Sequence, residues 1–287
     1  MIARLHVLLP FTFTVPETEQ FTIYSYIDAG YKIWIYPPKR TDAAINDDDV
    51  EEITVNGIKA FRANGLQIDF YKDNFDRRDS IVCDPPLGFI KKTINLFLVK
   101  LRFVTGGSAI KPIDFPLVTW RITYLNDDET ELIAEKGFVR GRFSKAMSVS
   151  WITVNSQIWE NLHSLPPDYT PPAWELLLLD SKDLLPEIGP SIVLAMTALE
   201  VFISIFLDLL ADRSSIPQEL WKWINNRQWF LQNPTNDDQF DRLLKILTGV
   251  SLKDENELWE AFKNLKKARN SFVHEGIAKI GEQTLNR

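Results

Sequence analysis

The chain has 287 residues, and at roughly 150 residues per domain this length predicts about two domains. Apolar residues make up 45% and charged residues 25%, which is typical of globular proteins and excludes a wholly disordered or collagen-like chain. The net charge of −7 argues against a surface coated with positive charge for non-specific nucleic-acid binding, but leaves room for a local basic site. Cys83 is the only cysteine, so no intrachain disulfide can form and a cytoplasmic location fits best. The three histidines lie far apart in the sequence, so we expect no metal site and no cofactor.

Two apolar stretches bear on membrane association. Residues 1–15 contain a proline and no small-residue cleavage site, so they match a first strand better than a signal peptide. Residues 192–207 are long and very apolar, but Glu200 lies in their middle, where a carboxylate would be costly in a bilayer. We therefore expect the central, buried helix of a soluble bundle and no membrane partner.

The first half of the chain has the pattern of a β domain. Short runs of β-branched and aromatic residues alternate with polar residues and are bounded by turn residues, such as RANG at 62–65. This pattern predicts six to eight strands in a mostly antiparallel sandwich or barrel. The runs lie at 21–27, 31–36, 53–61, 66–71, 94–104 and 117–125. A connecting helix is expected over 148–162, and residues 1–164 are expected to form one β-rich domain, a sensor or a partner-binding module.

The second half has the pattern of helices. Four prolines in residues 165–173 predict a stiff, extended linker, which we take as the domain boundary. Residues 174–287 are expected to form an α-helical bundle of about five helices, so the fold class is α+β. The helices are expected at 174–185, 191–211, from Pro217 to about Trp229, 237–247 and 254–274. The last is expected to end at Gly276 and to bury a stripe of Leu258, Ala261, Phe262, Leu265, Ala268, Arg269, Phe272 and Val273.

The common catalytic motifs are missing from the sequence. It contains no dinucleotide-binding glycine motif, no phosphate-binding Walker loop, no zinc-protease helix and no nucleophile elbow. Cys83 is best explained as an inert cysteine at a strand end. The acidic residues Asp47, Asp48 and Asp49 lack calcium-loop spacing, so a solvated loop explains them.

One segment, residues 265–276 with the sequence LKKARNSFVHEG, stands apart. Arg269 is followed directly by Asn270 and, after three further residues, by His274. This arrangement on the last helix of a small bundle resembles the Rx4–6H motif of the HEPN superfamily. The ALE sequence at 198–200, inside the long helix, resembles the same domains, and the resemblance covers roughly residues 174–280. The β-rich half resembles no family that we recognise.

The resemblance implies a metal-independent endoribonuclease that acts as a homodimer through the helical domain, with motifs from two chains meeting at one site. It also implies a role as a toxin or in antiviral and antiphage defence, with an antitoxin or other regulatory partner to be considered. Other members of the superfamily have lost catalysis and serve as RNA-binding or assembly domains. The catalytic residues implied here are Arg269, Asn270 and His274.

The residue types suit this chemistry on physical grounds. Histidine can serve as acid or base near neutral pH, and arginine offers a permanent charge that matches phosphate oxygens. Asn270 and His274 are four residues apart and stack on one helical face, where the asparagine can orient the phosphate or the imidazole. Arg269 lies five residues before His274, which is about 140° round the helix. Its long side chain can still reach the groove beside Asn270 and His274.

Several alternatives stay open. Arg269 and His274 also suit the C-terminal end of a helix dipole. Lys263, Lys266 and Lys267 can guide an RNA backbone or form a solvated face. Glu200 can position the motif or pair within the bundle, and the tryptophans of the second half can stack bases or fill the core. The rival functions are a non-catalytic RNA- or nucleotide-binding module, a dimerising sensor or scaffold, and nucleotide transfer in the same basic groove.

Overall fold

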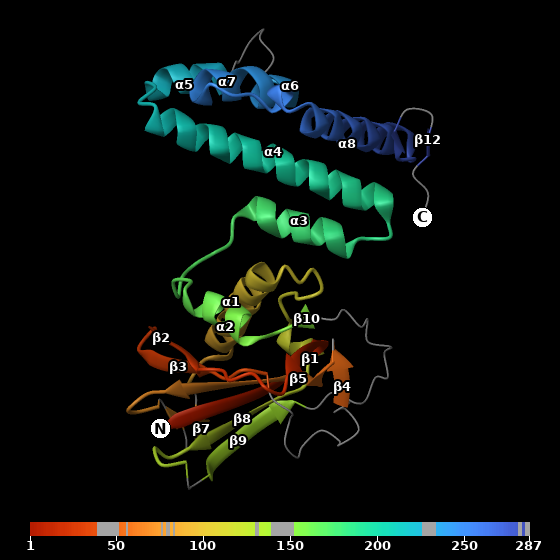
Figure 1. The fold of residues 1–287 in the computed structure, drawn as a ribbon. Coiled ribbons are helices and arrows are strands. Elements are labelled where there is room, and N and C mark those ends of the chain that lie inside the picture. The colour runs from red at the N-terminus through yellow and green to blue at the C-terminus, as the bar shows by residue number, and fades with distance from the viewer. Residues whose placement is uncertain are drawn as a thin grey trace. The chain divides into compact units, whose positions relative to one another are not determined.

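A computed structural model describes residues 1–38, 52–55, 57–75, 77–78, 81–82, 84–129, 132–138, 152–225, 234–280 and 283–284. The chain divides into two compact units, Met1–Pro171 and Pro172–Arg287. The division lies inside the proline-rich segment expected as the boundary. An antiparallel sheet dominates the first unit and helices follow in the second, so the fold class is α+β (Figure 1).

The first unit is built on one sheet. Its strands run in the order β2-β3-β5-β1-β8-β9, with β4 pairing with β5. These seven are antiparallel, and β10 adds a parallel strand beside β1. The strands are β1 (Ile2–Pro16), β2 (Tyr24–Asp28), β3 (Tyr31–Ile35), β4 (Glu52–Val55), β5 (Ile58–Tyr71), β8 (Trp120–Leu125), β9 (Leu132–Phe138) and β10 (Ile152–Thr153), while β6 (Arg77–Arg78) and β7 (Ile81–Val82) form a separate small pair.

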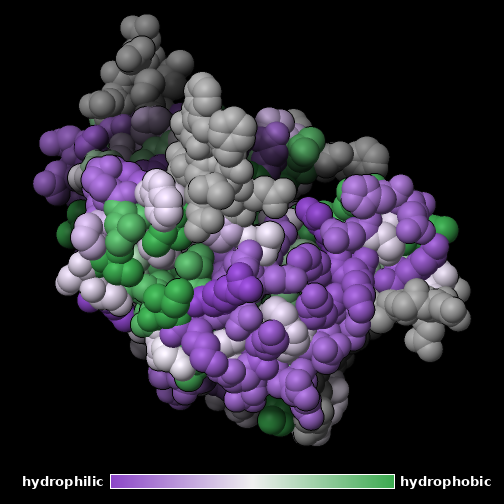
Figure 2. Space-filling view, turned by 90° about the horizontal axis from the view of Figure 1, so that it is seen from above, coloured by the Kyte–Doolittle hydropathy of each residue, from purple (hydrophilic) through white to green (hydrophobic). Residues whose placement is uncertain are grey.

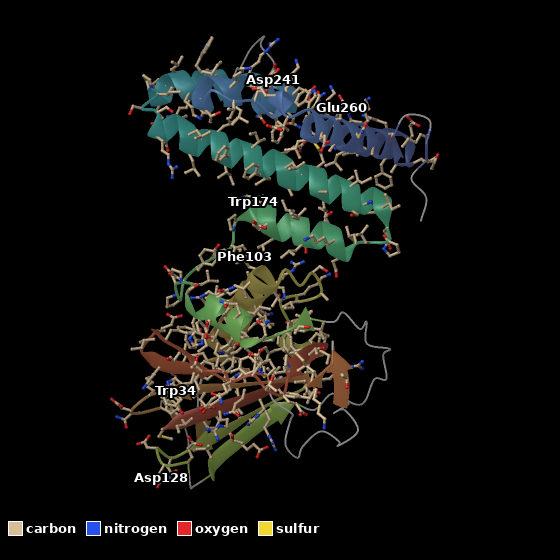
Figure 3. All side chains as sticks on the ribbon, in the orientation of Figure 1. Trp34, Phe103, Asp128, Trp174, Asp241 and Glu260 are labelled. Carbon is tan, nitrogen blue, oxygen red and sulfur yellow. The ribbon has the colours of Figure 1, made fainter. Side chains whose placement is uncertain are left out.

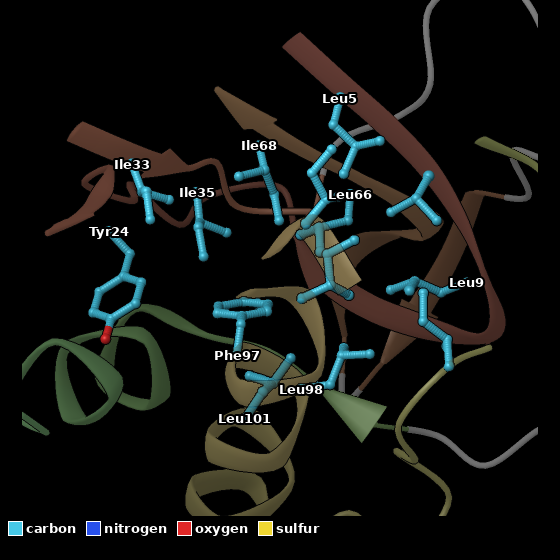
Figure 4. Close-up of a cluster of buried hydrophobic side chains, with 14 of the residues drawn as sticks. Leu5, Leu9, Tyr24, Ile33, Ile35, Leu66, Ile68, Phe97, Leu98 and Leu101 are labelled. Atoms are coloured by element: carbon cyan, nitrogen blue, oxygen red, sulfur yellow. The ribbon is translucent and has the colours of Figure 1, made fainter. Parts of the chain in front are cut away.

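The prediction of a strand at 94–104 is wrong, because this run belongs to helix α1 (Leu87–Thr105). Within 94–104 the β-branched and aromatic residues favour a strand, but the buried positions follow a helical period once the window is extended backwards. They are Ile90, Ile94, Phe97, Leu98 and Leu101. These side chains meet Leu5, Leu66 and Ile68 of the sheet (Figure 4). A helix, rather than the second sheet of a sandwich, therefore covers the core face.

The predicted turn at 62–65 is also absent, since β5 runs through it. Gly65 pairs with Leu8 of β1, and the register shifts between Leu8 and Phe13 of that strand. A glycine inside a strand often marks such an irregularity rather than a chain reversal. The two longest strands of the sheet therefore pair along both halves of their length.

The end of the first unit is held by a buried lysine. After β10 comes α2 (Ser156–His163), which is shorter than the helix expected over 148–162. Lys100 of α1 is buried and donates to the carbonyl oxygens of Pro166 and Pro167 at 2.7 and 2.5 Å. The first part of the proline-rich segment is thus fastened to the β-rich unit instead of forming a free linker.

The second unit contains helices near the positions expected from the sequence, but the helix expected at 237–247 includes a π-helical turn, and the expected end near Trp229 lies outside the described residues. The helical elements are α3 (Ala173–Asp183), α4 (Ile188–Arg213), α5 (Gln218–Asn225), α6 (Asn236–Asp238), the π-helical turn η3 (Gln239–Leu243), α7 (Leu244–Thr248) and α8 (Asn256–Glu275). Two short strands, β11 (Lys279–Ile280) and β12 (Gln283–Thr284), form a hairpin after α8. Two 3-10 turns, η2 (Phe115–Leu117) in the first unit and η4 (Leu252–Asp254) in the second, complete the elements.

Helix α4 is central, as expected, but it is less buried than expected. It lies between α3 on one side and the layer of α5 to α8 on the other (Figure 1). In the described residues it is the one helix long and apolar enough to cross a membrane, and 22% of its most apolar stretch is buried. Two of its carboxylates are tied to the bundle: Glu200 accepts from Asn236 Nδ2 at 2.7 Å, and Asp208 accepts from Trp221 Nε1 at 2.6 Å.

The predicted core stripe of α8 is correct in part, since Arg269 and Phe272 are half-buried as expected, but Ala261 is exposed. Phe262 and Ala268 are buried, and Leu265 is half-buried against the cluster formed by α4, α5 and η3. Leu258 and Val273, by contrast, are 58% and 53% exposed. Both residues keep the helical spacing of the stripe, but they lie outside the part of α8 that the other described elements of this unit cover.

Helices α4 and α8 approach each other closely at Gly189. A Cβ atom built on Gly189 would overlap the ring of Phe272 on α8. Glycine is the residue that allows backbone and ring to come this close. The contact fixes the C-terminal half of α8 against the first turn of α4.

Replacing Gly189 with alanine should destabilise the helical unit by about 1–3 kcal/mol, because the new methyl group overlaps the Phe272 ring. Gly88 is a matched control, since it is also the second residue of a helix and a Cβ there meets no atom within 4 Å. Gly88→Ala should be neutral or stabilising by up to about 1 kcal/mol. The free energy of unfolding, followed by circular dichroism in urea, compares the two; equal effects would contradict the proposed overlap.

Candidate functional site

The motif residues lie in the last two turns of α8. Glu257 lies in the first turn of this helix and His274 in the last, which suits the helix macrodipole. The helix ends at Gly276, whose φ of 73° is left-handed and whose N–H donates to the carbonyl oxygen of Phe272 at 2.8 Å. The expected end of the helix is therefore confirmed, and the motif lies on regular helix.

Arg269 and Asn270 are brought together. One terminal nitrogen of the Arg269 guanidinium donates to Asn270 Oδ1 at 3.0 Å. Arg269 is half-buried, and its Nε is buried without a hydrogen-bond partner. No carboxylate within the described part of the chain pairs with this guanidinium, although a partly desolvated cation without a counter-ion is costly. The arrangement leaves its positive charge available to an external anion.

His274 is exposed on the outer side of the helix. Glu260 projects from the side of α8 that faces away from α4 (Figure 3). Lys267 and His274 follow it by seven and fourteen residues, close to two and four turns, so they share that side. Glu275, next to His274, is paired with Lys279 at 2.7 Å. His274 itself makes no hydrogen bond within the described residues, so its imidazole is exposed to a ligand or to water.

Two of the three lysines expected to bind RNA share one carboxylate. Lys266 Nζ lies 2.6 Å from Asp237 Oδ1, and Lys263 Nζ lies 3.2 Å from Asp237 Oδ2. Partial burial alone would raise the pKa of the Asp237 carboxyl, but the hydrogen bonds from Lys266 and Lys263 outweigh it and lower that pKa below its ordinary value. Lys267 is exposed and has no ion-pair partner among the described residues.

Asp237 was missed by the sequence analysis. It lies in the short α6, about thirty residues before the lysines, and nothing in the sequence connects the two segments. The local signal that does exist is the capping box of Thr235 and Asp238, which predicts a helix start at this point. That signal places Asp237 on a helix but says nothing about what it contacts.

The other candidate residues have contacts elsewhere, are exposed, or lie outside the described residues. Glu200 is bonded to Asn236 rather than to Arg269 or His274. Trp221 is buried, and Trp259 is half-buried against Phe262, with ring centroids 5.5 Å apart, so both serve packing. Trp223 is 58% exposed. Cys83, Asp47, Asp48, Asp49 and Trp229 lie outside the described residues.

The β-rich unit carries a second polar cluster, on the sheet face opposite α1. Asp69 is buried and accepts two hydrogen bonds from Arg4, at 2.9 and 2.8 Å, and one from Tyr36 at 3.0 Å. The bond to Asp69 raises the pKa of the Arg4 guanidinium above its ordinary value. Burial lowers the pKa of nearby His6. The buried carboxylate of Asp69 is therefore partnered by both Arg4 and Tyr36, as a buried charge requires.

Hydrophobic side chains gather in one patch at the left of the view from above, and the rest of that face is mostly hydrophilic (Figure 2).

Within the described residues, no group of histidine, cysteine, aspartate and glutamate side chains is arranged to hold a metal ion. Comparisons with protein-family models, curated proteins and solved structures find no match to this chain. The residues of α8 and their neighbours are therefore the features from which a function can be inferred.

Replacing Arg269 with methionine should leave the stability of the helical unit unchanged or raise it by up to about 1 kcal/mol, because an unpaired, partly buried charge is removed. Arg242 is a suitable control, since it is 79% exposed and pairs with Asp238 on the surface. Arg242→Met should change stability by less than about 0.5 kcal/mol. Urea unfolding of both variants provides the comparison, and a large loss for Arg269→Met would show that the guanidinium has a structural role.

Proposed function

We propose that the helical unit is a HEPN-type endoribonuclease that cleaves RNA without a metal ion. The observation that carries this proposal is the Arg269 guanidinium, which is fixed to Asn270, partly buried and unpaired with any carboxylate in the described residues. Such a group stabilises the negative charge that develops on a phosphate in the transition state. His274 stands exposed on the same two turns of the helix.

The chemistry requires a base, an acid and a positive charge. A histidine accepts the proton of the ribose 2′-hydroxyl, and the 2′-oxygen forms a bond to phosphorus. The bond from phosphorus to the 5′-oxygen breaks, and a second histidine donates the proton to that leaving oxygen. The products are a 2′,3′-cyclic phosphate and a free 5′-hydroxyl. In this scheme Arg269 stabilises the phosphate and Asn270 holds the guanidinium in place.

One chain contributes one such histidine, so the proposal includes a homodimer through the helical unit. Leu258, Arg269 and Val273 are spaced by eleven and four residues, which places them on one side of α8. The two apolar members of this set are exposed. A second copy packed against them would bury apolar surface beside Arg269 and bring the two Arg269 side chains together, with each His274 reaching the shared site from the neighbouring side of its helix, about 140° round from Arg269.

The broader role forms part of the same proposal. We place the protein in the cytoplasm, as a toxin or an antiviral defence factor, with the β-rich unit binding a ligand, an antitoxin or another regulatory partner. The non-catalytic alternative, an RNA-binding or scaffold domain, predicts binding or dimerisation without cleavage. The following experiment separates the two.

Purified full-length protein should cleave total RNA or defined transfer RNAs in excess EDTA. His274→Ala should slow cleavage by about 100- to 10,000-fold through the loss of acid-base catalysis. Arg269→Ala should slow it by about 100- to 1,000-fold through the loss of transition-state stabilisation. Arg242→Ala, a change to an exposed arginine of the same unit, should cleave at the wild-type rate. Cleavage that persists in both motif variants would reject the site, and RNA binding without cleavage would favour the non-catalytic alternative.

The dimer can be tested at Val273. Val273→Glu should convert the dimer to a monomer and abolish cleavage, because a charge cannot be buried cheaply in an apolar interface. Ile246→Glu makes the same chemical change at a residue of α7 that is 76% exposed, and should leave both properties unchanged. Sedimentation velocity measures the mass and circular dichroism checks the fold. A fully active monomer would overturn the composite site.

A further inference from the structure

The contact between Asp237 and the two lysines of α8 has the geometry of an anion held by a cationic pair. Each carboxylate oxygen accepts from a different ammonium group, at 2.6 and 3.2 Å. A phosphate group held by two lysines uses its oxygens in the same way. About a third of each of the three side chains is exposed, at 34% for Lys263, 30% for Lys266 and 33% for Asp237, so the pair is open to solvent and to ligands.

The pair lies in line with the motif. Lys263, Lys266 and Asn270 are separated by three and four residues, so they lie on one side of α8. Lys266 precedes Asn270 by one turn, which is about 6 Å along the helix axis. An RNA strand whose scissile phosphate is held by Arg269 and Asn270 would therefore present a neighbouring phosphate to the two lysines.

We propose that Lys263 and Lys266 form a second phosphate-binding subsite for the RNA backbone, in which the carboxylate of Asp237 occupies the place of the phosphate until the substrate displaces it. The RNA part of this proposal rests on the proposed function. The subsite is a property of three described residues and can be tested with binding alone. Asp237 then competes with the ligand for the two lysines, so that only ligands with several phosphates bind at this site.

The replacement of the Asp237 carboxylate by a phosphate on the two lysines costs little free energy. Partly exposed ion pairs contribute little to stability, because solvent screens them, so an incoming polyanion displaces the carboxylate at small cost. The position of α6 does not depend on Asp237, since Asn236 is bonded to Glu200 of α4 and Thr235 caps the turn. Removing the Asp237 charge should therefore free the lysines without unfolding α6.

The experiment measures binding of a single-stranded 2′-O-methyl RNA oligonucleotide, which lacks the attacking hydroxyl, to the full-length protein by fluorescence anisotropy at several salt concentrations. Asp237→Asn should bind about fivefold more tightly than the wild type at low salt, with a steeper dependence on salt, because two more cations reach the phosphates. Glu219→Gln removes one exposed negative charge from the same unit and should change affinity less than twofold. In the Asp237→Asn background, Lys263→Gln with Lys266→Gln should abolish the gain.

The proposal is overturned if Asp237→Asn and Glu219→Gln have the same affinity and salt dependence, or if the gain survives the loss of both lysines. Cleavage is scored separately with unmodified RNA. A gain in binding without cleavage by any variant would reject the proposed function and keep the subsite. Cleavage that depends on His274, combined with no gain in binding, would do the reverse.

Discussion

Phe272 lies so close to the backbone of Gly189 that a side chain larger than hydrogen does not fit between α4 and α8. This contact sets which side of the end of α8 faces α4. With Phe272 directed at α4, Ala268 one turn earlier is buried on the same side. The next residue, Arg269, reaches the margin of the helix contact, and Asn270 and His274 lie beyond it. A single close approach thus sets which motif groups are half-buried and which are open.

The charges along α8 are treated in two different ways. The ammonium groups of Lys263 and Lys266 share one carboxylate of α6, whereas the Arg269 guanidinium is bonded only to a neutral amide in the described part of the chain. Stability alone would favour a carboxylate beside Arg269 as well, because its Nε is buried without a hydrogen-bond partner. A cation left without a carboxylate is expected where stability is given up at a position that binds an anion.

A feature of the structure could be predicted when the residues that specify it lie close together in the sequence. The helices from α3 to α8 carry start and end signals in the sequence, as Pro217 and Gly276 show, and the predicted ends that lie on described residues are confirmed within a few residues. The pairing of Arg269 with Asn270 is also local. The run 94–104 was mistaken for a strand because its residue types favour strands, whereas the longer stretch from Ile90 has the helical spacing of a face that packs on Leu66 and Ile68. Tertiary contacts override intrinsic preferences in this way.

The contact of Asp237 with Lys263 and Lys266 could not be predicted for a different reason. Ion pairs between separate elements leave no periodicity, and any of the 18 acidic residues in 165–287 could have met these lysines. The choice is made by packing: the capping box starts α6 at Asn236, the bond from Asn236 to Glu200 fixes that turn on α4, and Asp237 is thereby directed to α8. The contacts that hold α6 on α4 therefore determine the charge that a ligand meets on the surface, and the basic stretch of the sequence overstates the positive charge that α8 presents.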